Sequence, residues 1–446
     1  MIWKELLNSQ RYGATKSINF DPARSPFEMD YDRIIFSYPF RRLQDKTQVF
    51  PLPDHDFVHN RLTHSLEVSS VGRSLGKMVG EKILEREKDL ALTAADFGSI
   101  VAAACLAHDI GNPPFGHSGE KAISEFFLNH VEGRIFESKV AKAEWADLIS
   151  FEGNAQGLRL LCHAQNKGLR LTHATLAAFT KYPCQSSFEG KSKEKKSQKK
   201  FGFYQTEASI FQEVAAATSL KEEIKNIAWA RHPLVYLVEA ADDTCYHIID
   251  LEDGCRLGWV RYEVARDLLA EIIGDAYKPE KLDDLETVEE KMATLRALAI
   301  NVLVGQLTKA FLDDEKEILG GTMNTDLFSL VPCSTTLEKI SKLSVAQIYQ
   351  SRQVIEKEAA GFQVISGLME AFCSAAYKVR FDDKPGYRDQ LVYKLMPSDI
   401  LLGIQKSKTT YQLLRTVLDF ISGLTDGHAL SLYRNLTGIS LPGIRS

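Results

Sequence analysis

The sequence lacks both a paired-cysteine motif and a long apolar run. Its seven cysteines are scattered, and no two stand in a C-x-x-C spacing, which is typical of a chain kept in a reducing cytosol. No window reaches 18 apolar residues, and the most apolar stretch, 100–107, is far too short to cross a bilayer. The first residues turn polar within a few positions, unlike a signal peptide. These absences predict a soluble, cytoplasmic protein without a membrane partner.

The sequence also lacks an excess of charge of one sign. Its 54 Lys and Arg residues face 59 Asp and Glu residues, so the formal net charge is −5. This balance excludes an extended basic coat for nucleic acid, although it allows a local basic patch. With 44% hydrophobic and 25% charged residues, the 446-residue chain has the composition of a globular protein. Collagen-like, disordered and disulfide-scaffold classes are thereby excluded.

Strand-like alternation is scarce, and no internal repeat is found at a period of 20–50 residues. Weak β signals occur only at 167–172 and 201–204. We therefore predict an all-α fold with small β excursions, in a single large helical domain over 1–446. Its catalytic core is expected at about 24–260 and a C-terminal helical part at about 260–446. Apolar periodicity predicts helices over 58–87, 93–109, 118–131, 152–163, 205–225, 233–251, 259–274, 286–313, 352–378, 397–405 and 410–422.

One segment differs from the rest in composition. Residues 184–200 are polar, mostly cationic and poor in apolar side chains. The composition favours a solvated, mobile surface loop. A second interpretation is that its last lysines, next to Phe201-Gly-Phe203, reach an anionic ligand.

Histidine and aspartate residues from three separate segments form a candidate metal site. His108-Asp109 ends a predicted apolar helix just before a Gly- and Pro-rich turn, and His64 opens another helix. Asp242 lies within a strongly apolar predicted helix, where a buried carboxylate needs a partner. Two imidazoles and two carboxylates suit a catalytic divalent metal with open positions, unlike a closed structural zinc site. We expect Mn²⁺ or Mg²⁺, while Fe²⁺, Co²⁺ and Zn²⁺ also fit; the alternative is a salt-bridged helix whose acidic face lies in water.

A candidate acid–base pair follows the metal residues. His117 and Glu120 are three residues apart at the start of the next predicted helix, so the carboxylate can orient and charge-stabilise the imidazole. The alternative is a helix-capping histidine beside an ordinary glutamate. Further along, Asp242, Tyr246 and Asp250 stand at i, i+4 and i+8, forming one polar stripe on an apolar helix.

These residues, in this order, resemble the HD superfamily of metal-dependent phosphohydrolases. Within it, the chain is similar to the bacterial dGTPase-type deoxynucleoside triphosphate triphosphohydrolases over nearly its whole length, except for 185–199 and 275–395. The strings that carry the resemblance are Arg24-Ser-Pro-Phe-Glu28, Phe40-Arg-Arg-Leu-Gln-Asp-Lys-Thr-Gln-Val-Phe50, Arg61-Leu-Thr-His64-Ser-Leu-Glu-Val68, Ala107-His-Asp-Ile-Gly-Asn-Pro-Pro-Phe-Gly-His117, Phe151-Glu-Gly-Asn-Ala-Gln156, Thr180-Lys-Tyr-Pro183, Lys200-Phe-Gly-Phe203, Arg231-His-Pro-Leu234, Glu239-Ala-Ala-Asp-Asp243, Ser422-Gly-Leu-Thr-Asp426 and Leu432-Tyr-Arg434.

The resemblance implies an HD-type helical fold and hydrolysis of a dNTP at the α-phosphate, giving deoxynucleoside and inorganic triphosphate. It implies that His64, His108, Asp109 and Asp242 hold the metal and that His117 and Glu120 are catalytic. The implied substrate contacts are Arg61 with the α-phosphate, Lys181, Tyr182 and Lys200 (or its neighbour Lys199) with the triphosphate, Tyr246 with the sugar, and Gln44 and Asp250 with the 3′-hydroxyl.

Other assignments stay open at this point. Asn154 and Gln156 either fix a loop or contact the ligand, and His163 and His173 are expected to be structural. The resemblance also implies a homo-oligomer, often a hexamer, with a dNTP or single-stranded DNA as effector in some members. The alternatives are an HD nucleotidase or phosphodiesterase, or a nucleotide- or single-stranded-DNA-binding module that uses the cations of 191–200.

Overall fold

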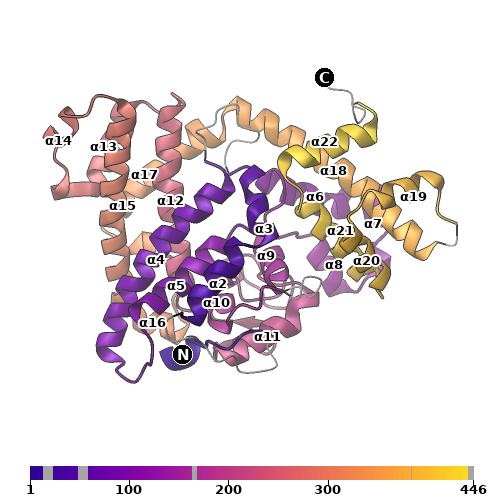
Figure 1. Cartoon of the computed structure of the whole chain (residues 1–446), viewed down its shortest axis with the longest axis horizontal. Coiled ribbons are helices and arrows are strands. Elements are labelled where there is room, and N and C mark those ends of the chain that lie inside the picture. Colours follow the sequence, from indigo (N-terminus) through magenta and orange to yellow (C-terminus); the bar gives the residue numbers. More distant parts are fainter. Residues whose placement is uncertain (14–23, 49–58, 163–167, 383, 440–446) are drawn as a thin grey trace.

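A computed structural model describes residues 1–13, 24–48, 59–162, 168–382 and 384–439. The described chain is almost entirely helical, which confirms the predicted all-α class, and Figure 1 shows how the helices are arranged. The helices are α1 (Trp3–Leu6), α2 (Pro26–Ile35), α3 (Tyr38–Arg41), α4 (Arg61–Arg86), α5 (Ala94–Ala107), α6 (Gly116–Asn129), α7 (Val131–Arg134), α8 (Lys142–Leu148), α9 (Gly153–Cys162), α10 (His173–Phe179), α11 (Ala208–Ala217), α12 (Val235–Arg256), α13 (Tyr262–Ile273), α14 (Glu280–Asp283), α15 (Val288–Asp313), α16 (Glu315–Gly320), α17 (Ser334–Ser344), α18 (Arg352–Phe381), α19 (Tyr387–Lys394), α20 (Ser398–Lys406), α21 (Thr410–Ser422) and α22 (Asp426–Thr437).

Local sequence signals explain where the principal site helices begin. The Asn60 side chain accepts a hydrogen bond from the Thr63 amide at the start of α4. Thr93 and Asp96 form the predicted capping box at the start of α5. These caps satisfy backbone N–H groups that the first helical turn leaves without partners. Both helices that contribute histidines to the metal residues therefore have well-defined first turns.

Three local predictions of secondary structure are wrong. The helix expected over 205–225 ends at Ala217, because Ser219 adopts a left-handed backbone conformation, φ 49°. The chain then forms the antiparallel pair β1 (Glu222–Ile224) and β2 (Ala228–Trp229). Neither 168–172 nor 201–204 is a strand in the described chain; Thr172 makes an isolated bridge with Arg11. Burial, not strand pairing, accounts for the apolar residues at 201–204.

The helices bury two large hydrophobic clusters. The first includes buried faces of α4, α5, α12 and α15, and the second those of α6, α18 and α21. In Figure 1, α13, α14 and α15 lie at one end of the molecule, and α19 and α20 lie at the other. Phe115, just before α6, belongs to the second cluster, whereas Val354, near the start of α18, belongs to the first. A single domain over 1–446 stays a prediction.

The segment 184–200 is largely irregular and its residues 187–194 are exposed or half-buried, as its composition predicts, but its last part packs against the protein. Ser197 and Gln198 are buried, and Lys196 forms an ion pair with Asp326. The Lys191 ammonium donates hydrogen bonds to the carbonyls of Gln185 and Ser186. Composition alone misleads for this last part because the polar groups satisfy one another and their neighbours.

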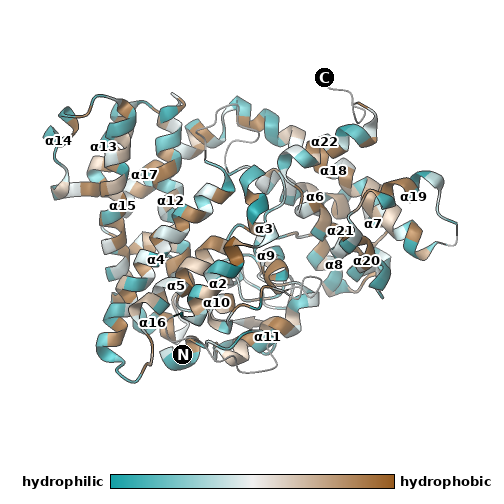
Figure 2. Cartoon of the chain, viewed as in Figure 1, coloured by the Kyte–Doolittle hydropathy of each residue, from teal (hydrophilic) through white to brown (hydrophobic). Residues whose placement is uncertain are grey.

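Two helices, α15 and α18, are long and apolar enough to cross a membrane by length and composition alone. They bury 44% and 50% of their apolar windows inside this chain. Figure 2 shows hydrophilic residues interspersed with hydrophobic ones along both helices. About half of each window is therefore covered by the rest of the chain.

Candidate active site

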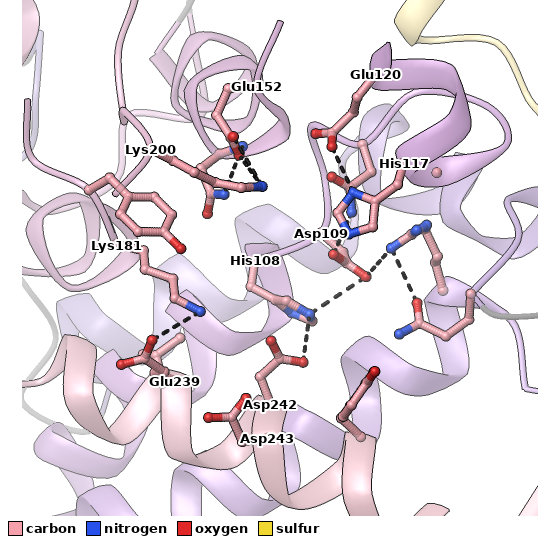
Figure 3. Close-up of a pocket in the computed structure, with 18 of the residues that line it drawn as sticks. His108, Asp109, His117, Glu120, Glu152, Lys181, Lys200, Glu239, Asp242 and Asp243 are labelled. Carbon is pink, nitrogen blue, oxygen red and sulfur yellow. Dashed lines mark hydrogen bonds and ion pairs between the residues drawn. The ribbon is translucent and has the colours of Figure 1, made fainter. Parts of the chain in front are cut away.

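A cavity of about 750 Å³ opens where α4, α6, α12 and the turn after α5 meet. Its lining includes most of the residues that the sequence predicts for the site, and Figure 3 shows their arrangement. The predicted residues among them are Arg61, His108, Asp109, His117, Glu120, Asn154, Lys181, Tyr182, Lys199, Lys200, Asp242 and Tyr246. Residues separated by more than 180 positions in the sequence therefore share one space.

The four predicted metal ligands lie together. His64, His108 and Asp109 each offer a ligand atom, all within 4.8 Å of one another. An oxygen of Asp242 lies 3.1 Å from Nε2 of His64 and 3.5 Å from Nε2 of His108. His64 comes from the first turn of α4, His108 and Asp109 follow the last turn of α5, and Asp242 lies within α12. Three helices thus bring two imidazoles and two carboxylates to one point.

His108 supplies the test of whether a metal ion fits. Its Nδ1–H donates a hydrogen bond of 2.6 Å to the carbonyl of Cys105. The lone pair of the ring is therefore on Nε2, where it can bind a metal ion. That Nε2 is buried and has no hydrogen-bond partner among the described residues. Buried polar atoms are rarely left unpaired, and a metal-binding histidine characteristically donates its other ring N–H to a carbonyl. The donor set fits a divalent metal ion.

Arg61 forms an ion pair with Asp109 and favours the ionised form of this predicted metal ligand. Its Nη1 lies 2.5 Å from Oδ2 of Asp109. Burial acts to raise the pKa of Asp109, but the charge of Arg61 acts against it, and the pKa is lowered overall. The amide of Asn112 donates a 2.6 Å hydrogen bond to the other carboxylate oxygen. Asp109 is therefore fixed as a carboxylate beside the cavity.

His117 and Glu120, the predicted acid–base pair, are in contact, and their catalytic role stays a prediction. His117 Nδ1 lies 2.8 Å from Oε2 of Glu120, so the imidazole donates to the carboxylate. Oε1 of Glu120 accepts the Gly153 amide N–H at 2.7 Å. Burial acts to raise the pKa of Glu120, yet the His117 hydrogen bond and the charge of Lys200 lower it overall. The His117 side chain is 82% exposed, so its Nε2 is accessible for proton transfer.

Three lysines border the cavity, and two of them, Lys181 and Lys200, each contact a buried glutamate. Lys181 Nζ lies 3.2 Å from Glu239, which also pairs with Arg231 at 3.0 Å. Lys200 Nζ lies 3.1 Å from Glu152. In Figure 3, Lys181 and Glu239 lie on one side of His108, and His117 and Glu120 lie on the other. Tyr182 is buried beside Lys181, whose ammonium lies 5.9 Å from the centre of the ring.

Of the three predicted sugar contacts, Tyr246 lines the cavity, whereas Asp250 and Gln44 are not part of its described lining. Tyr246 lines the cavity and stacks on Tyr349, with 5.5 Å between ring centres. Asp250 lies behind this pair, buried, and accepts the Tyr349 hydroxyl at 2.5 Å. Burial raises the pKa of Asp250 to about 7, although the Tyr349 hydrogen bond opposes the shift. Gln44 is exposed and lies outside the described cavity lining. The roles of Asp250 and Gln44 stay predictions.

Of the residues whose roles the sequence left open, one lines the cavity and two of the others lie outside its described lining. Asn154 lines the cavity. Gln156 is buried between Asp419 and Arg415 of α21, and its side chain hydrogen-bonds to both. His173 is buried next to Glu213 and is not part of the described lining. His163 lies outside the described residues.

Sequence reasoning missed several lining residues. Tyr349 belongs to a π-helical turn (Val345–Tyr349), a rare element that is frequent at functional sites. Val354 and Glu358 follow on α18, in a region where no family string was found. Glu152 and Glu239 lie within two of the family motifs, but the sequence predicts no function for either residue. Each glutamate is far in sequence from the lysine that it contacts, so no local pattern predicts the ion pair. A charged residue in an apolar segment is the one available signal, because such residues are rarely buried without a partner.

Comparison with known proteins agrees with this geometry. The family model of the HD domain matches residues 61–152, and that of the phosphohydrolase-associated domain matches 332–435. Over 99% of its length, the chain is 40% identical to a deoxyguanosinetriphosphate triphosphohydrolase-like protein of Synechocystis, which it covers completely. Like-named proteins of Pseudomonas aeruginosa and Listeria monocytogenes are 39% and 38% identical, with 99% of this chain and 100% of theirs covered. The chain belongs to the deoxyguanosinetriphosphate triphosphohydrolase-like family.

Family membership identifies the chain as an HD phosphohydrolase. Together with the His-His-Asp group, it supports a metal-dependent nucleotide hydrolase. The second family model also covers part of the region where no family string was found in the sequence, including Tyr349 and Glu358.

Proposed function

We propose that this enzyme hydrolyses deoxynucleoside triphosphates at the α-phosphate, releasing deoxynucleoside and inorganic triphosphate. One observation carries the proposal: a single cavity combines the metal residues, a histidine–carboxylate pair and cationic side chains on two sides. A polyphosphate needs several cations along its length, and the reacting phosphorus needs both positive charge and proton transfer beside it. The names of the relatives support a dNTP as substrate.

The metal residues mark the expected position of the α-phosphate. A divalent ion held by His64, His108, Asp109 and Asp242 supplies positive charge that polarises a phosphoryl oxygen and makes water more acidic. Arg61 presents a second cation at the same place, held against Asp109. The arginine neutralises negative charge that develops on the phosphoryl oxygens during attack.

His117 transfers the proton. Attack of water at the α-phosphorus forms a P–O bond and breaks the bond to the 5′-oxygen, which leaves with a proton. His117 either accepts the proton of the attacking water or donates one to the departing oxygen. Glu120 orients the ring and compensates the charge of the imidazolium in both cases.

Other residues at the cavity are proposed to contact the triphosphate and the sugar of the substrate. Lys181 and Lys200 contact the β- and γ-phosphates, and Tyr182 packs beside Lys181. Tyr246 packs against the deoxyribose, where a ribose 2′-hydroxyl would collide with the ring. Asp250 and Gln44 hydrogen-bond the 3′-hydroxyl in this proposal.

Product analysis tests the function directly. Purified enzyme with Mn²⁺ is incubated with each of the four dNTPs, separately and mixed, and the phosphorus products are separated. Inorganic triphosphate with free deoxynucleoside is the expected result. Orthophosphate or a nucleoside monophosphate would instead indicate an HD nucleotidase or phosphodiesterase, and no turnover with Mn²⁺, Mg²⁺, Fe²⁺, Co²⁺ or Zn²⁺ would favour a binding module. Turnover only in mixtures would indicate a dNTP effector.

We also propose a cytoplasmic homo-oligomer. On α19, Tyr387 and Leu391 are exposed at i and i+4, and exposed Leu395 follows at i+8. An apolar stripe of this kind supports a contact between copies of the chain. Light scattering gives the mass in solution, and a monomer at micromolar concentration would contradict this part of the proposal.

A further inference from the structure

Two of the three lysines that line the cavity, Lys181 and Lys200, form ion pairs with carboxylates of the protein. Lys200 Nζ lies 3.1 Å from one Glu152 oxygen and 3.4 Å from the other. Lys181 Nζ lies 3.2 Å from Glu239. Both glutamates are almost fully buried, whereas the two lysines keep exposed surface at the cavity. An anion that enters the cavity must therefore compete with a protein carboxylate for the ammonium of Lys181 and for that of Lys200.

Each carboxylate has a second donor that holds it in place when the lysine leaves. Glu152 accepts hydrogen bonds from the Asn154 side-chain amide at 2.6 Å and from the Asn154 backbone at 3.2 Å. Glu239 keeps its ion pair with Arg231, whose side chain is buried. Burial and the neighbouring charge of Glu120 raise the pKa of Glu152, whereas the charge of Lys200 lowers it. The contacts suit a reversible exchange better than a permanent salt bridge.

We propose that Glu152 and Glu239 are positioning residues that take Lys200 and Lys181 back from the bound triphosphate and thereby promote product release. This inference rests on the proposed function, because it assumes that inorganic triphosphate is the product. The competing carboxylates lower the affinity for any anion that uses the two lysines. Their effect is greatest on the product, which carries the whole phosphate chain and none of the nucleoside contacts.

The charge removed in Glu152→Gln decides the sign of the expected effect. Without the Glu152 carboxylate, Lys200 binds phosphate oxygens more strongly, because only the more distant charge of Glu120 still compensates its own. We expect inorganic triphosphate to bind and inhibit roughly tenfold more tightly. KM and kcat should fall together in steady state, with a burst in the first turnover, since release becomes slower than chemistry. Loss of structure at the site would instead weaken binding and raise KM.

The experiment measures the binding of inorganic triphosphate by calorimetry and its inhibition of dNTP turnover, for the wild type and three variants. Glu152→Asp keeps the charge and should stay near the wild type. Glu223→Gln is the matched control, because Glu223 forms a 2.7 Å pair with Lys195 in the same segment and neither residue belongs to the described cavity lining. Unfolding temperatures confirm that each variant is folded. Glu152→Gln is preferred over Glu239→Gln, which leaves buried Arg231 without its carboxylate.

Tighter triphosphate binding in Glu152→Gln alone, with a first-turnover burst, supports the inference. Equal or weaker binding in that variant overturns it, as does the same gain in Glu223→Gln or in Glu152→Asp. Failure of calorimetry to detect triphosphate binding to either the wild type or Glu152→Gln overturns it too. The proposed function fails separately, when the wild type releases no inorganic triphosphate from any dNTP. The two failures are therefore distinguished by different measurements.

Discussion

His117 shows how one side chain is prepared for chemistry without contributing to the packed interior. Its ring is largely exposed, and the buried Glu120 holds it through one ring nitrogen. The Gly153 amide fixes that carboxylate in turn. A group with so little buried surface contributes little to stability, so its substitution should separate catalysis from folding.

We expect His117→Gln to reduce kcat by about 10²- to 10⁴-fold, the usual contribution of a general acid or base. Metal binding and dNTP affinity should stay near the wild type, because the substitution removes no metal residue and no arginine or lysine from the cavity. His428→Gln, at an exposed histidine on α22 outside the described cavity lining, serves as the control and should be neutral. Kinetics and metal titration test this, and an equal loss of binding and turnover would contradict the catalytic role.

At the scale of elements, a seam of glycines lets α4 approach α5 closely. Gly72, Gly76 and Gly80 follow one another at i, i+4 and i+8 on the face of α4 that meets α5. A Cβ at Gly76 would lie 2.7 Å from the Phe97 carbonyl oxygen and 3.0 Å from the Gly98 Cα. Since His64 begins on α4 and His108 follows α5, the separation of these helices decides whether both imidazoles reach one ion.

Gly76→Ala should therefore lower the free energy of unfolding by about 1–3 kcal/mol, because backbone atoms must move to admit the methyl group. It should also weaken Mn²⁺ binding. Gly305→Ala is the matched control: it lies in α15 with no heavy atom within 4 Å of the added Cβ, and alanine there should stabilise by about 0.5–1 kcal/mol. Chemical unfolding and Mn²⁺ titration of both variants test this prediction. A Gly76→Ala protein with wild-type stability and wild-type Mn²⁺ affinity would contradict it.

At the scale of the whole molecule, a buried ionic network joins the two hydrophobic clusters. Arg159 on α9 makes two 2.7 Å hydrogen bonds to Asp419 on α21 and a third, of 2.6 Å, to Glu207. Gln156 on α9 donates to the same aspartate. Because Asn154 lies near the start of α9 in the cavity wall, α21 supports the site from a part of the chain far away in sequence.

Asp419→Asn should lower the free energy of unfolding by about 3 kcal/mol, since it leaves the buried Arg159 with one carboxylate where it had two. Glu356→Gln removes a partner from an exposed pair with Arg352 and should cost less than about 1 kcal/mol. Chemical unfolding of the two variants measures the difference. Equal losses would mean that the network between the clusters is no stronger than a surface ion pair.

The fold class, most helices and the types of side chain at the site could all be predicted from the sequence. Apolar periodicity is local, so it predicted α4, α5 and α12 closely, and an aspartate within an apolar helix already required a partner. The order of the histidines and aspartates predicted the donors that meet at the metal residues. Each of these inferences depends on neighbours in sequence or on side-chain chemistry alone.

Which side chains face one another could not be predicted, because it depends on how the helices pack. The pairing of Lys200 with Glu152, the stacking of Tyr349 on Tyr246 and the burial of Ser197 join segments whose contact no local pattern encodes. Composition predicted a solvated loop at 184–200 because it counts polar groups without their partners. The physical reason is that burial and pairing depend on how helices pack in space, and that packing is a property of the whole chain.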